Sequence, residues 1–315
     1  MKIEIKIYVL LILFCGKVWA QDDAPVESVQ NKIKVDQMLM ITTSSLPEAQ
    51  FSYICDWKIP FLKGSSALTK DNNITLHFRA NISPVNFDFS TEIIWTPIAF
   101  LELNAGLTTG SGWHISLLGK EIYGIGISGQ AIDGSSVVDS EPFSGVISKL
   151  RFGGALQADV AAFSPGEWHH IVVRTYHEVN YFEFSAANND QSWYYANDSG
   201  ENTNGFNYNG NFLIGYQMPL FLNFTGIMTE ANLRMRPASG GTLWGDDVPY
   251  LLITALANFK VSEKFDFRII CQFQSKRNYT DDNWELLYYR NRHIDNNDKF
   301  HIEFYRVAGM FMWHL

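Results

Sequence analysis

Charged residues recur at alternate positions of this 315-residue chain, with apolar or aromatic residues between them. Charges beside so much apolar surface must meet water or a partner of opposite sign. In one interpretation they line a water-filled passage and set the field inside it. In the other they pair within a closed interior, and the sequence leaves both open. The residues assigned to this lining are Arg79, Glu92, Glu102, Arg151, Asp159, Arg174, Asp266, Arg268 and Arg306, with Asp56, Lys58 and Lys260 on the same face.

Histidines are the residues from which a hydrolytic site would be built. Such a site needs a serine, a histidine as base and an Asn, Asp or Glu that orients the histidine. The candidates are His169, His170, His177 and His293, and none lies in a His-x-Ser-Asn arrangement. The chain also lacks Gly-x-Ser-x-Gly and His-Glu-x-x-His. We therefore expect no enzyme, and keep a lipid hydrolase as the lesser alternative.

Acidic residues offer one further site to weigh, a cation site at Asp295-Asn296-Asn297-Asp298. The stretch lacks the glycine and the distal glutamate of an EF-hand loop, so a solvated loop is the better interpretation. We expect neither a metal nor another cofactor.

The stretch Phe300–Leu315, FHIEFYRVAGMFMWHL, shows how the charged and apolar positions are separated. Every second residue back from Leu315 through Trp313 to Tyr305 is apolar or aromatic, whereas the set from His314 to Phe304 is mixed. Successive side chains of a strand point to opposite faces, so this is one strand with an apolar face. Such a face invites aggregation on a soluble edge strand, but is what lipid requires of a closed barrel.

The same alternation runs through most of the chain and predicts a closed antiparallel transmembrane β-barrel. The predicted strands lie at Ile33–Thr43, Phe51–Leu62, Leu76–Ile82, Phe87–Trp95, Leu101–Thr108, Leu150–Val160, Trp168–Ser185, Phe206–Met218, Leu220–Met235, Leu251–Lys260, Phe265–Gln274 and Phe300–Leu315. This gives about twelve strands, with ten or fourteen as alternatives. A soluble β-sandwich also explains the alternation, but not the many aromatic residues at strand ends.

Tight turns and long polar connections alternate along the chain, as they do in porin-like barrels. Turn signals at Pro97, Pro165, Pro219 and Ser262–Lys264 are expected on the periplasmic side, together with the end of the last strand. The weaker segment Asp281–Arg292 is expected in an outer loop, as one strand too many. The Gly/Ser-rich segment Gly110–Ser148 either extends a strand or folds inward.

Composition narrows the class of protein. The chain is 46% hydrophobic and 15% aromatic, yet it has no run of about 18 apolar residues that would form a membrane helix. Its net charge of −9 argues against nucleic acid as a partner. Cys55 and Cys271 both fall on apolar strand faces and make no disulfide framework.

The N-terminus, Met1–Ala20, has the pattern of a secretory signal, cleaved after Ala20. Lys2 and Lys6 precede a short apolar core, and small residues stand at the cleavage site. Residues 21–49 then form an N-terminal segment that includes the first strand in the twelve-strand interpretation. Residues 50–315 form the barrel.

Two motifs carry a resemblance to a known family. Trp95–Leu101 with Asn104-Ala105-Gly106, and Phe304–Val307, resemble hairpins and terminal strands of Gram-negative outer-membrane β-barrel proteins, including spirochaete-type ones. The resemblance implies the barrel and location in the outer membrane of the cell. It implies no substrate and transfers no functional residue.

The expected function is therefore a passive, porin-like channel for small solutes. The first alternative is a closed barrel whose outer loops, Ala186–Gly205 among them, bind a surface partner. The expected partners are membrane lipids, a lipopolysaccharide-type outer leaflet, the solutes themselves, and the barrel-assembly machinery through Phe300–Leu315.

Overall fold

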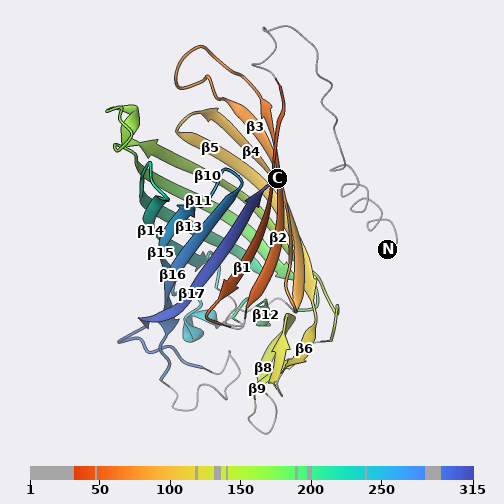
Figure 1. Ribbon diagram of the computed structural model, residues 1–315. Helices are drawn as coiled ribbons and strands as arrows, with labels where there is room; N and C mark the ends of the chain where they lie inside the picture. The colour runs from red at the N-terminus through yellow and green to blue at the C-terminus, as the bar shows by residue number, and fades with distance from the viewer. Residues whose placement is uncertain are drawn as a thin grey trace. The chain divides into compact units, whose positions relative to one another are not determined.

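Twelve antiparallel strands close into a barrel in the computed structural model of the chain (Figure 1). The structure describes residues 32–46, 48–117, 120–130, 136–139, 141–188, 191–196, 201–237, 240–280 and 292–315. The predicted signal Met1–Ala20 lies outside the described residues. In wall order the strands are β1 (Lys34–Ser44), β2 (Ala49–Pro60), β3 (Asn73–Ile82), β4 (Asn86–Ile98), β5 (Leu101–Gly112), β10 (Ile147–Asp159), β11 (Ile171–Phe184), β13 (Gly205–Gln217), β14 (Leu222–Arg234), β15 (Tyr250–Lys260), β16 (Phe265–Arg277) and β17 (Phe300–His314).

The first and last strands close the wall, because β1 pairs with β17 as well as with β2. The fold class and the twelve-strand count are thus confirmed, including a first strand drawn from the N-terminal segment. Residues 281–291 lie outside the described residues, and the flanking strands β16 and β17 pair directly with each other.

Four connections with predicted turn signals lie at one end of the barrel, together with the end of β17, whereas the short connections 45–48 and 83–85 lie at the other end (Figure 1). The four span residues 99–100, 218–221, 261–264 and 160–170, the last of which includes the 3₁₀ turn η3 (Val160–Ala162). This confirms that the predicted tight turns share one end, although Pro97 lies in the last residues of β4 rather than in the turn. The longer connection 61–72 also lies at this end.

The opposite end carries additional strands beyond the wall. The segment Gly110–Ser148 first completes β5, then forms β6 (His114–Leu117), β7 (Lys120–Tyr123), β8 (Ile125–Gln130) and β9 (Ser136–Asp139). β8 and β9 join β12 (Trp193–Tyr195) in a small sheet, and a second 3₁₀ turn, η4 (Gly241–Trp244), follows β14. A buried cluster of Ile125, Ile147, Phe184 and Trp193 packs these connections against the ends of the wall strands.

The outward face of the wall is apolar on nearly every strand. Large exposed side chains occur there at alternate positions, as in Phe89 and Ile93 of β4 or Phe212 and Ile214 of β13. Cys55 and Cys271 lie on this outward face, as the alternation predicts, and neither is part of a disulfide bond. So much exposed apolar surface is uncommon on soluble monomers.

One part of the face assignment in the last strand is wrong. The pairing of β17 with β16 shifts register between Gln272 and Phe273, which leaves Tyr305 as an extra residue in a β-bulge. Before the bulge the alternation is therefore reversed, so Phe304 is 55% exposed on the outer wall whereas Tyr305 is half-buried. A bulge inserts one residue into the period of two, and the sequence pattern alone does not show where.

Candidate functional site: the polar inner wall

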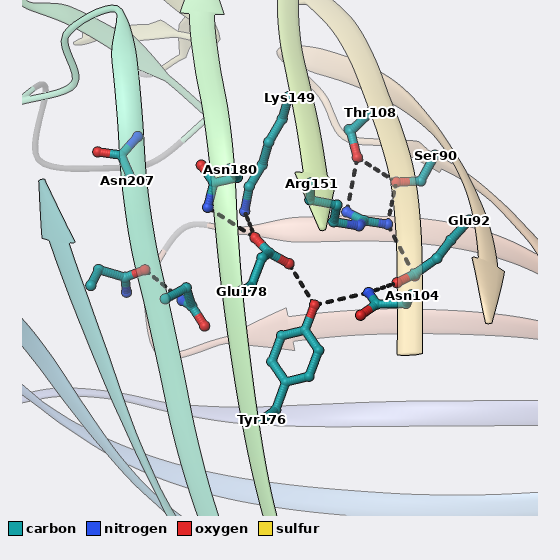
Figure 2. A network of polar contacts seen from close by, with 12 residues as sticks. Ser90, Glu92, Asn104, Thr108, Lys149, Arg151, Tyr176, Glu178, Asn180 and Asn207 are labelled. Atoms are coloured by element: carbon teal, nitrogen blue, oxygen red, sulfur yellow. Dashed lines mark hydrogen bonds and ion pairs between the residues drawn. The ribbon is translucent and has the colours of Figure 1, made fainter. Parts of the chain in front are cut away.

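The inner wall carries a hydrogen-bonded network that spans four neighbouring strands, β4, β5, β10 and β11 (Figure 2). Its first centre is the ion pair between Arg151 Nη2 and Glu92 Oε2, 3.2 Å apart. Arg151 Nη1 also donates to Thr108 Oγ1 at 3.1 Å, and Asn104 Nδ2 donates to Glu92. Both charged side chains are about 15% exposed (16% and 15%), so the pair is shielded but reaches water.

A second centre lies on β11 and is joined to the first through Asn104. The Tyr176 hydroxyl accepts from Asn104 Nδ2 at 2.9 Å and donates to Glu178 Oε2 at 2.7 Å. The other Glu178 oxygen receives Lys149 Nζ at 3.0 Å and Asn180 Nδ2 at 2.9 Å. Both oxygens of the buried Glu178 carboxylate therefore have partners, and the two centres form one network.

Two inner-wall glycines let these side chains lie along the wall. Arg151 crosses β5 at Gly106, where an added Cβ would lie 2.9 Å from Arg151 Nε. Tyr176 crosses β10 at Gly153, where a Cβ would lie 2.7 Å from its hydroxyl. Because these glycines have no side chain, Arg151 and Tyr176 can pass over the neighbouring strand and reach partners on the strand beyond it. They therefore do not extend across the lumen.

The remaining charges assigned from the sequence also lie on the inner face, and most have a partner. Arg174 Nη2 lies 3.0 Å from Glu102 Oε2, and the two side chains are 33% and 27% exposed, respectively. Asp159 differs in position, since it ends β10 at the rim, where it meets His170 at 2.7 Å and caps η3. The other contacts are Arg79 to Asn81, Arg268 to Asn258, Asp266 to His314, Asp56 to His77, and Arg306 to Gln272 and Glu48.

The next strands of the wall, β13, which pairs with β11 beside the network, and β14, carry amides on their inner face. Asn207, Asn209 and Asn211 share the inner face of β13, and Asn209 donates to Asn232 of β14. Glu230 stands opposite Asn211 in register.

Several of these residues were not singled out from the sequence as lining, namely Lys149, Tyr176, Glu178, Asn180, Asn104 and the amides of β13 and β14. The signal was present for some of them. Tyr176, Glu178 and Asn180 follow Arg174 at spacings of two, so the same alternation places them on its face. No sequence signal showed that Asn104 would connect the two centres, because that contact joins residues 72 positions apart.

The candidate hydrolytic histidines do not converge. His169 and His170 lie in the connection between β10 and β11, at the end of the barrel where β17 ends, whereas His293 lies in the connection before β17, at the other end. His177 faces outward, where it contacts Thr175 Oγ1 at 3.0 Å and the Tyr208 hydroxyl at 2.6 Å.

The described residues also bear on metal binding and on helical spans. No group of three His, Cys, Asp or Glu side chains within the described ranges is arranged to hold a metal ion. In the Asp295–Asp298 stretch, Asp295 accepts from the backbone N–H of Asn297 at 2.8 Å, as in a polar turn. Where the chain is described, no helix has the length and apolar character to cross a membrane.

Comparison with known proteins finds similarity in structure only. No protein-family model and no curated protein matches the chain. Among solved structures, the COG4313 outer-membrane channel of Pseudomonas putida F1 is 9% identical, with a TM-score of 0.44 over 93% of this chain and 100% of that chain. OmpT of Vibrio cholerae is 5% identical with a TM-score of 0.34, over 93% and 100% of the two chains. The outer-membrane phospholipase of Salmonella typhi is 8% identical with a TM-score of 0.32, over 92% and 94%. Likenesses at this level carry no argument about function, which must come from the inner wall.

Proposed function

We propose that this protein is an outer-membrane β-barrel that passes small polar solutes through its lumen. The apolar outward face supports the membrane location, because lipid covers such a face without cost and water does not. In that location lipids and a lipopolysaccharide-type leaflet surround the wall. The terminal segment Phe300–Leu315 is then the one that barrel-assembly machinery would recognise.

One observation carries the channel proposal: the long polar side chains of the network lie along the wall. Arg151 and Tyr176 could extend across the lumen, but their partners on neighbouring strands hold them flat over Gly106 and Gly153. A closed interior is better built from side chains that meet across the barrel. Groups that lie flat and reach water favour a passage lined with satisfied polar groups.

The direct test is the conductance of refolded protein in a planar bilayer, with ion selectivity taken from the reversal potential. Stable, discrete current steps are expected. Arg174→Ala should make the channel less anion-selective, because the guanidinium is partly exposed and its loss leaves Glu102 without its cation. Arg236→Ala, in the exposed connection after β14, is the matched control and should leave the selectivity unchanged.

Absence of current from protein shown to be folded would refute the channel. Recovery of the mature protein in the soluble periplasmic fraction of cells would refute the membrane location. These two outcomes are independent, because a closed barrel would still fractionate with the membrane.

A second candidate function, a scaffold that presents its loops, is favoured by the ordered contacts among three of the long connections. Glu201 receives Arg277 Nη1 at 3.0 Å and the Tyr279 hydroxyl at 3.1 Å. Arg234 pairs with the buried Asp246 at 3.1 Å. If folded protein conducts no current, loss of partner binding after Glu201→Ala would support this function.

A further inference from the structure

The inner face of the described wall differs between β13 and β14 and the strands on either side of them. On the strands that run from β16 through β1 to β11, most inner-wall acids lie beside a base, whereas Asp88 accepts from Asn81. The ion pairs and histidine contacts are Glu92–Arg151, Glu102–Arg174, Glu178–Lys149, Asp56–His77, Asp266–His314 and Glu48–Arg306. In the four pairs that contain arginine or lysine, opposite charges about 3 Å apart largely cancel at the distance of a passing solute, and salt screens what remains.

The inner face of β13 and β14, next to β11, has hydrogen-bonding capacity that the protein itself does not use. An amide offers two donor hydrogens and an acceptor oxygen with two lone pairs. Asn209 and Asn232 share one bond, which leaves the Asn209 oxygen and the Asn232 amino group for other partners. Asn211 makes no side-chain hydrogen bond within the described residues, and Asn207 makes one long contact of 3.3 Å to the Gly205 carbonyl.

These amides form a row along two adjacent strands. Asn207, Asn209 and Asn211 stand at alternate positions of one strand, about 7 Å apart from one to the next. Asn232 lies opposite Asn209 on the adjacent strand and is exposed. Glu230 adds one acceptor beside Asn211, and its charge interacts with that of Lys149.

We propose that the lumen selects neutral, polyhydroxylated solutes, such as monosaccharides and sugar alcohols, through the amides of β13 and β14. This inference rests on the proposed channel function and names its solute class. A hydroxyl group both donates and accepts, and so does an amide, so a row of unused amides can exchange bonds with successive hydroxyls. A charged solute gains little, because most cations and anions of the other wall strands are already paired.

The test is solute flux into proteoliposomes by osmotic swelling, with glucose and mannitol compared with gluconate and lysine. Glucose and mannitol should enter faster than the charged solutes of similar size. The double substitution Asn209→Leu with Asn232→Leu, and Asn211→Leu alone, should each slow glucose entry. Loss of a hydrogen bond of ordinary strength predicts about a fivefold effect. Conductance in potassium chloride should change little, which also shows that the variants fold.

Gln217→Leu is the matched control, since Gln217 is an exposed amide at the end of β13, outside the row. It should leave glucose entry unchanged. If the channel conducts but passes all solutes alike, or the row variants behave as Gln217→Leu does, the solute class is wrong and the channel stands. If folded protein shows neither current nor flux, the channel function itself fails, and the inference with it.

Discussion

Glu92→Gln tests most directly whether the polar network borders the path of ions. The substitution keeps the shape of the side chain and an acceptor oxygen for Asn104, but removes the charge that faces Arg151 at 3.2 Å. The guanidinium charge on the inner wall is then no longer balanced by its neighbour. The lumen should become more favourable to anions and less favourable to cations.

The size of this effect follows from Coulomb's law. A unit charge about 6 Å from an ion in water contributes about 0.7 kcal/mol. At about 0.1 M salt, where the Debye length is about 10 Å, screening reduces this to about 0.4 kcal/mol. Anions gain and cations lose this amount, so the ratio of the two permeabilities should shift by about 0.8 kcal/mol, or about fourfold.

Reversal potentials across a potassium chloride gradient measure this ratio. The measurement should be repeated near 1 M salt, where the Debye length is about 3 Å and the shift should nearly vanish. Glu167→Gln removes a carboxylate from the exposed connection between β10 and β11 and is the control. A conducting Glu92→Gln channel with unchanged selectivity at low salt would show that ions do not pass the network, and the argument from flat-lying side chains would fall.

Three further predictions test the glycine crossing, the two faces of the wall and a buried tyrosine. Gly153→Val should lower single-channel conductance, because its Cβ would lie 2.7 Å from the Tyr176 hydroxyl and displace that ring into the lumen; unchanged conductance would contradict the crossing. Phe212→Arg should lower the free energy of unfolding of the barrel in vesicles, measured by urea unfolding, by about 2–4 kcal/mol. Asn211→Arg on the inner face should lower it far less. Equal losses for the two variants would mean that the faces are misassigned. Burial raises the pKa of Tyr279. Its contribution to stability should therefore be complete below about pH 10 and be lost as the pH rises through the raised pKa. An ultraviolet titration in which Tyr279 has the ordinary pKa of a tyrosine would contradict this.

The wall of the barrel was predictable because the signal is local and repeated. In strands such as Phe206–Gln217, the period of two assigns each side chain to a face without knowledge of its neighbours. Tertiary contacts set the exceptions. The bulge at Tyr305 reversed the faces of the preceding residues, and the strands within Gly110–Ser148 depend on the buried Trp193 of a distant connection.

The candidate site was predictable only in part, for the same reason. Alternation places Arg151 and Glu92 on the inner face, but it cannot say that they meet, because they lie on strands separated by β5. Register decides this, and register follows from turn lengths and packing along the whole sheet. Gly106 and Gly153 were equally hidden, since a glycine in a strand pattern signals weakness or close approach without showing what approaches.

The positions of these two glycines connect the fold to the proposed function. A barrel of this size leaves a bore that long side chains can nearly close. The same Arg and Tyr side chains would obstruct the lumen if the strand beside them carried a Cβ at the crossing point, as the 2.9 Å and 2.7 Å approaches show. The hydrogen-bond partners of Arg151 and Tyr176 would not by themselves keep the bore clear. The side chains can reach those partners only where the strand between them leaves space. Conduction should therefore depend on Gly106 and Gly153 at least as much as on the polar side chains that cross them.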